Sequence, residues 1–253
     1  MVFDCEGGFE LENLHTYGEP LTIPDIFQNI GYAHQHTLQT IAIDKEKIRN
    51  DFINYRAKCT QYRESFDHYI DEFEQKRFMS PVELLVCTHY RDIDHIYHEL
   101  FNRIDQFNAE LSEVKNWKYC RCYGDKNIKH LLLKKHLYQN SHEHFFHGNA
   151  VLDVAAMIKY HMEHVEWENT ELTEYFSIYT KINPLDQVEL SLLAIHLLDP
   201  TDYLQAGEDY AMKVSERTMM EQVIIMKENH RFLLQMLNWS QKNLVLKNDT
   251  DEI

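Results

Sequence analysis

The sequence contains few residues that bend or break a chain. Only 7 glycines and 5 prolines occur in 253 residues, too few for a collagen-like, low-complexity or turn-rich all-β protein. No run of about 18 apolar residues is present, so no transmembrane span is expected. The first twelve residues, MVFDCEGGFELE, are acidic and lack an apolar segment, so they do not resemble a signal peptide. We therefore expect a cytoplasmic protein.

Basic residues are also scarce. The 25 lysines and arginines face 41 acidic residues, which gives a formal charge of −16. Proteins that bind nucleic acid usually carry a basic face or stripe, and the sequence has none, so we expect no nucleic-acid partner. The charge instead favours basic partners or cationic ligands. Glycine-rich nucleotide loops and the Gly-x-Ser-x-Gly pattern are absent, so the sequence nominates no nucleophile.

Cysteine is rare, and its number is odd. With five cysteines and no secretion signal, we expect reduced thiols. Cys120 and Cys122 form the one pair that is close in sequence. A single intervening residue is not the spacing of a zinc finger, and no second pair completes a set of four ligands. The sequence therefore does not favour a metal site at this pair.

What the sequence does have is helical periodicity. No glycine or proline occurs between Tyr32 and Ser80, and apolar residues recur there at alternating spacings of three and four. Ten of the eleven positions on this stripe are apolar or aromatic, whereas an overall hydrophobic content of 44% predicts about five. The pattern predicts a helix of roughly 40 residues, about 60 Å long. The stripe comprises Leu38, Ile41, Lys45, Ile48, Phe52, Tyr55, Cys59, Tyr62, Phe66, Tyr69 and Phe73.

The fold class that follows is all-α, a multi-helix bundle. Ser80-Pro81-Val82-Glu83 is a helix start with a capping box, so residues 34–118 are predicted to form a long antiparallel hairpin. Residues 1–33 are predicted to be an irregular arm with one short helix, which Gly31 ends. Residues 119–253 are predicted to add further helices in one continuous domain. These helices are expected at 127–147, 151–180 and 185–198, with a last one from about Thr201.

Histidine is abundant, with 16 in the chain. Histidines and carboxylates three or four residues apart share a helix face, and facing helices of a bundle can hold two metal ions with them. The pattern suggests iron or another divalent metal, with His89, Glu99, His161, Glu166 and Glu168 as candidate ligands. Four histidines have an acid four residues ahead, against about 2.6 expected by chance from this composition.

The densest histidine cluster comprises His142, His144 and His147, just before Gly148. At a helix C-terminus the macrodipole favours such cationic side chains. A pH-sensitive surface and metal capture are the other two interpretations of this cluster.

Arg63 and His68, with four residues between them, resemble the arginine–histidine pair of the HEPN superfamily of small helical ribonucleases. The resemblance would imply RNA cleavage by these two side chains. Glu64 departs from the family pattern, which prefers a small polar amide after the arginine.

Three functions are therefore predicted, in order. The first is a soluble, acidic, all-helical protein-binding or adaptor module without catalysis, because helical periodicity is strong and no catalytic signature is present. The second is a helical-bundle non-haem iron protein, with a di-metal His/carboxylate site, for oxygen binding or oxidation. The third is a HEPN-like ribonuclease. A protein partner is expected, and an oligomer is compatible with the sequence.

Overall fold

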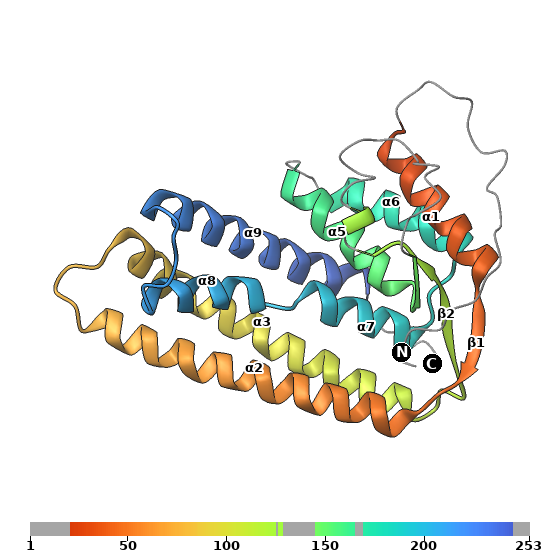
Figure 1. The fold of residues 1–253 in the computed structure, drawn as a ribbon, viewed down its shortest axis with the longest axis horizontal. Coiled ribbons are helices and arrows are strands. Elements are labelled where there is room, and N and C mark those ends of the chain that lie inside the picture. The colour runs from red at the N-terminus through yellow and green to blue at the C-terminus, as the bar shows by residue number, and fades with distance from the viewer. Residues whose placement is uncertain (1–20, 125, 129–144, 165–168, 245–253) are drawn as a thin grey trace, which may run out of the picture. The chain divides into compact units, whose positions relative to one another are not determined.

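The computed structural model of the chain describes residues 21–124, 126–128, 145–164 and 169–244, without the side chains of 161–164 and 169–170 (Figure 1). It divides into two compact units, each built from two stretches of the sequence. The first unit comprises Met1–Ile43 and Lys115–Asp186, and the second comprises Asp44–Val114 and Gln187–Ile253. The domain boundaries expected at residues 33/34 and 118/119 stay a prediction.

The predicted all-α class is confirmed, because most described residues lie in helices and the one described sheet is small. The described residues of the second unit form helices and their connections, without a strand. It contains α2 (Lys45–Glu74), α3 (Pro81–Leu111), α7 (Gln187–Leu197), α8 (Thr201–Ala211) and α9 (Met219–Asn243). The first unit contains α1 (Ile23–Thr37), β1 (Gln39–Ala42), β2 (Asn116–Cys122), β3 (Phe146–Gly148), α5 (Val151–His164) and α6 (Asn169–Ile182).

Helices α2 and α3 form the predicted antiparallel hairpin and lie side by side (Figure 1). As the sequence predicts, Ser80 caps α3: its hydroxyl accepts the Glu83 amide at 3.2 Å, and the Glu83 carboxylate accepts the Ser80 amide at 2.7 Å. Because such a box satisfies amides that have no partner within the helix, the chain reverses and restarts within a few residues.

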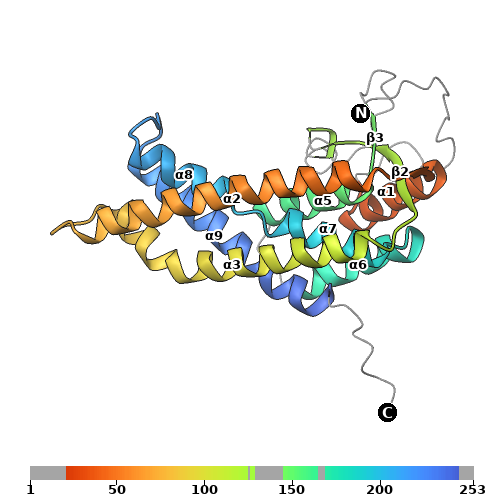
Figure 2. The same cartoon turned by 90° about the horizontal axis from the view of Figure 1, so that it is seen from below.

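Apolar residues that recur along α3 at spacings of three and four face the core of the second unit. α3 packs against α2, α7 and α9 (Figure 2), so one continuous face of this helix loses contact with water. Burial of such a face supplies most of the stability of a helix in a globular protein. The buried apolar residues on this face are Val82, Val86, Ile93, Ile96, Tyr97, Leu100, Ile104, Phe107 and Leu111.

The predicted 40-residue helix is wrong at its beginning. α1 ends at Thr37, and residues 39–42 form β1, which pairs antiparallel with β2. α2 begins only at Lys45, where the carboxylate of Asp44 caps the amide of Lys47 at 3.0 Å. Ile41, a stripe position, is 44% exposed. Hydrogen bonds to a strand more than 70 residues away therefore outweigh the local helical pattern.

One other predicted helix is described in two parts, and another is interrupted. The segment 151–180 contains α5 and α6, and residues 165–168 between them lie outside the description. The last predicted helix breaks into α8 and α9, and Lys213 in the connection has a left-handed φ of 57°. Thr218 and Glu221 form a capping box at the start of α9, a signal that the sequence carries and that predicts this break.

The predicted helix end at Gly31 is also wrong, because α1 runs through this residue to Thr37. Gly31 faces α6, and a Cβ atom there would lie 3.4 Å from the Cβ of Ile182. Its small size thus allows α1 to pack closely against α6. The three strands of the first unit form a sheet of order β1–β2–β3, with both pairings antiparallel.

Candidate functional site

A cluster of fully buried polar and thiol side chains lies in the first unit. His34 comes from α1, Cys120 and Cys122 come from β2, and Asp153 comes from α5; each has an exposed fraction of 0%. Burying such groups is costly unless each has a polar partner. The hydrogen bonds of this cluster are therefore the features that set its geometry.

Asp153 fixes the turn that follows β2. One carboxylate oxygen, Oδ2, accepts the amide of Tyr123 at 2.6 Å, and the other, Oδ1, accepts the amide of Gly124 at 2.8 Å. Gly124 has a φ of +79°, a conformation that glycine adopts readily and that other residues rarely adopt. The buried carboxylate thus holds two successive amides of a tight turn in one orientation.

His34 is held at both ring nitrogens. Its Nε2 lies 3.1 Å from Oδ2 of Asp153, and its Nδ1 lies 2.8 Å from the hydroxyl of Tyr179. The side-chain amide of Asn183 donates to the same hydroxyl at 2.7 Å. This network connects α1, α5 and α6 and leaves the imidazole little rotational freedom.

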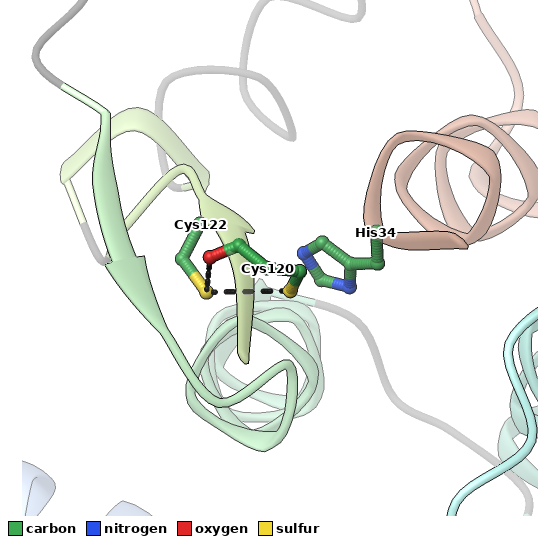
Figure 3. Close-up of side chains that lie close together, drawn as sticks. All are labelled: His34, Cys120 and Cys122. Atoms are coloured by element: carbon green, nitrogen blue, oxygen red, sulfur yellow. Dashed lines mark hydrogen bonds between the residues drawn. The ribbon is translucent and has the colours of Figure 1, made fainter. Parts of the chain in front are cut away.

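Cys120 and Cys122 lie on one face of β2, because alternate residues of a strand point to the same side. Their sulfur atoms are 3.8 Å apart, and the His34 ring points toward them from α1 (Figure 3). The Sγ of Cys122 also lies 3.5 Å from the carbonyl oxygen of Asn149. The hydrogen bond with the Cys120 thiol and burial raise the pKa of Cys122 far above its usual range.

His34, Cys120 and Cys122 could together hold a metal ion. One donor atom from each lies within 4.8 Å of the others, and among the described residues no further His, Cys, Asp or Glu donor joins this group. The sequence shows the two cysteines as a close pair but did not favour a metal site there, and it did not point to His34, which lies 86 residues before Cys120. The sequence signal available was the Cys-x-Cys pair on one face of a strand; the third donor becomes visible only when α1 packs against β2.

The ligands predicted from histidine and carboxylate spacing lie elsewhere. His89 stacks on His230, with ring centroids 3.5 Å apart, and its Nδ1 lies 3.1 Å from the Tyr203 hydroxyl. Glu99 accepts a hydrogen bond from Nε of Arg103 at 2.8 Å. His89 and Glu99 are ten residues apart on α3, about 15 Å along the helix, so the structure does not bring them together.

The remaining predicted ligands are Glu166 and Glu168, which lie outside the described residues, and His161, whose side chain lies outside them. Their role stays a prediction. His142 and His144 also lie outside the described residues. His147 does not end a helix: it lies on β3, opposite Arg121, and its ring contacts Tyr119 edge-on. A helix dipole therefore does not act on His147.

Arg63 and His68, which resemble a ribonuclease motif, have different partners in the structure. Arg63 forms an ion pair with Asp94. His68 lies 3.3 Å from Glu72, one turn further along α2, and the His68 side chain is 69% exposed. The two residues take part in separate ion pairs on the outside of the hairpin, where such pairs contribute little to stability.

The buried His89 predicts a pH dependence of stability. Burial, followed by the neighbouring charges of His230 and Lys227, lowers the pKa of His89 from 6.5 to about 4, although Asp92 acts in the opposite direction. Between these two values the unfolded chain binds a proton that the folded chain does not. The free energy of unfolding should therefore rise with pH from 4 to 6.5, with His89 contributing up to about 3 kcal/mol. Urea unfolding at several pH values measures this slope.

In the variant His89→Gln the slope between pH 4 and 6.5 should become shallower, because glutamine does not titrate. His68→Gln serves as the control, since His68 is largely exposed; its slope should match that of the unmodified chain. Equal slopes for all three proteins would contradict the assignment.

One solved structure resembles this chain over most of its length. It is an aminoglycoside phosphotransferase from Alicyclobacillus acidocaldarius, with a TM-score of 0.53, 12% sequence identity, and coverage of 89% of this chain and 70% of that chain. No family model and no curated protein matches the chain. Within the described residues, no helix is long and apolar enough to cross a membrane.

This likeness corrects the predicted function. The sequence favoured a protein-binding or adaptor module without catalysis, because no catalytic signature was visible. The chain instead shares its fold with an enzyme. Nothing in the sequence pointed to this likeness, since the similarity lies in the arrangement of helices and strands at 12% identity.

Proposed function

We propose that the protein is an enzyme that transfers a phosphoryl group from ATP to a hydroxyl group of a small cationic acceptor. The shared fold with an aminoglycoside phosphotransferase supports the reaction class. The formal charge of −16 supports a cationic acceptor, because an acidic protein attracts cations electrostatically.

The observation that carries the proposal is the turn after β2. Asp153 holds the amides of Tyr123 and Gly124 at 2.6 and 2.8 Å, and the side-chain amide of Asn127 donates to the carbonyl of Tyr123 at 2.8 Å. Backbone held this firmly requires no ordering during the reaction. A loop fixed at the end of a strand is therefore suited to present reactive side chains.

The residue types after this turn suit phosphoryl transfer. Asp125 follows Gly124 directly, and Asn127 comes two residues later; in kinases an aspartate of the catalytic loop accepts the proton of the substrate hydroxyl, and an asparagine binds Mg²⁺. Asp125 lies outside the described residues, so its role is proposed from its place in the sequence. The hydroxyl oxygen would bond to the γ-phosphorus, the bond to the oxygen of ADP would break, and the proton would pass to Asp125.

The chain departs from the pattern of protein kinases in three places. Asp125 and Asn127 are two residues apart, whereas the corresponding aspartate and asparagine of the kinase catalytic loop are five residues apart. The chain also contains no Asp-Phe-Gly tripeptide and no Gly-x-Gly-x-x-Gly loop, the segments that bind Mg²⁺ and cover the phosphates in those enzymes. Binding of ATP phosphates would therefore depend on other residues.

The test is a measurement of Mg²⁺-dependent ADP release, with mass spectrometry of the acceptor, over aminoglycosides and uncharged polyols. The variant Asp125→Asn should lower kcat by about 10²–10⁴, because it removes the general base. Asp51→Asn removes an exposed carboxylate of α2 and should leave the rate unchanged. A rate in the unmodified protein no higher than in Asp125→Asn, for every acceptor, would contradict the proposal.

The identity of the metal is a separate question. The prediction of iron rested on histidines and carboxylates, whereas the described donor group consists of one histidine and two cysteines. Iron therefore stays a prediction from the sequence, and so do a protein partner and an oligomeric state.

A further inference from the structure

We propose that His34, Cys120 and Cys122 bind one Zn²⁺ ion, which joins α1 to β2 inside the first unit. The three donor atoms lie within 4.8 Å of one another, and all three residues are fully buried. This inference is independent of phosphoryl transfer, because it concerns the donors themselves and not the turn at Gly124.

The sulfur separation matches zinc. Thiolate ligands lie about 2.3 Å from Zn²⁺, so two of them on a tetrahedral ion are about 3.8 Å apart. The sulfur atoms of Cys120 and Cys122 are 3.8 Å apart in the structure. Binding of the ion would therefore require little movement of either thiol. A fourth ligand such as water would complete a Cys₂His site.

A disulfide between the same cysteines fits less well. A disulfide requires sulfur atoms about 2.05 Å apart and α-carbons usually no more than about 6.8 Å apart. Two residues along an extended strand already separate the α-carbons by about 6.8 Å, and both cysteines lie in the segment of β2 that pairs with β3, opposite Gly148 and Phe146. Closing the bond would distort this strand pairing, whereas an ion bridges the existing gap.

The surroundings of His34 resemble the outer shell of a metal-binding histidine. Such a histidine usually donates its second ring nitrogen to a carboxylate or another polar group. Here Nδ1 contacts the Tyr179 hydroxyl at 2.8 Å, and Nε2 contacts Asp153 at 3.1 Å. Coordination through either nitrogen breaks one of these bonds and keeps the other, so the ring stays oriented.

The donor types select the metal. Thiolate and imidazole ligands together suit Zn²⁺, whereas Mg²⁺ and Ca²⁺ prefer oxygen ligands, which this group lacks. On binding, each of Cys120 and Cys122 would lose its proton to solvent and form a sulfur–zinc bond, with no change of oxidation state.

The experiment is Zn²⁺ binding by the full chain, purified without an affinity tag under reducing conditions and stripped with a chelator. We expect one equivalent of zinc per chain after incubation and gel filtration, and a rise in Tm of about 5 °C or more with excess free zinc. Less than a tenth of an equivalent would overturn the proposal.

Two matched double variants locate the ion. Cys120→Ser/Cys122→Ser should lose the bound zinc, while Cys59→Ser/Cys87→Ser, which alters two cysteines of the hairpin, should keep it. Retention of zinc in the first variant, or its loss in the second, would overturn the assignment.

A measurement on the unmodified protein tests the same ligands even if the first double variant fails to fold. X-ray absorption of the zinc-loaded chain should show two sulfur neighbours at about 2.3 Å, with nitrogen or oxygen in the other positions. A first shell with no sulfur, or with three or four sulfur atoms, would exclude the proposed ligand set.

Discussion

Replacing Asp153 with alanine should destabilise the protein by about 3–5 kcal/mol, because removing one member of a buried charged network leaves its partners without compensation. The carboxylate accepts the amides of Tyr123 and Gly124 and contacts Nε2 of His34, and it is fully buried. Denaturant unfolding measures the loss of stability. Hydrogen exchange provides a local test, since both amides should exchange much faster in Asp153→Ala.

Asp186→Ala is the matched control in the same unit. Asp186 forms an ion pair with Lys118 at 2.9 Å, and its side chain is 51% exposed. Its removal should cost no more than about 1 kcal/mol and leave exchange at Tyr123 and Gly124 unchanged. Similar losses in the two variants would show that Asp153 is not a buried anchor.

Replacing Phe107 with alanine should destabilise the second unit by about 3–5 kcal/mol, because it removes a buried ring and leaves a cavity. Phe107 on α3 is fully buried, and its ring centroid lies 4.5 Å from that of Phe52 on α2. The aromatic contact between the two helices of the hairpin would be lost with it. Urea unfolding followed by circular dichroism measures the change.

Phe78→Ala makes the same chemical change at a different place. Phe78 lies in the connection between α2 and α3 and is 80% exposed, so its loss should change stability by less than about 0.5 kcal/mol. Equal effects at positions 78 and 107 would contradict the assignment of Phe107 to the core.

The elements best predicted from the sequence are those that local interactions decide. The start of α3 needs only Ser80, Pro81 and Glu83, and its buried face follows from spacings of three and four along one helix. The same capping signal is present at Thr218, where the break before α9 could have been predicted. In each case the interacting residues lie within four positions of one another, so the helix start or the buried face can be recognised from the local sequence.

The elements that the sequence did not predict depend on distant partners. β1 interrupts a helical pattern because residues 39–42 pair with residues 116–119. β3 replaces the expected end of a helix because residues 146–148 pair with residues 120–122. Strand pairing stabilises the fold only when both segments lie side by side. The periodicity of residues within one segment therefore does not indicate which segment is its partner.

The sequence by itself therefore determined the helical class, the hairpin and the buried face of α3, because spacing and capping act over one or two helical turns. Only the tertiary structure decided which polar groups meet. It paired Arg63 of α2 with Asp94 of α3, and it brought His34 beside Cys120 and Cys122. A site of this kind depends on side chains that converge from elements far apart in the chain, and their distances follow from packing.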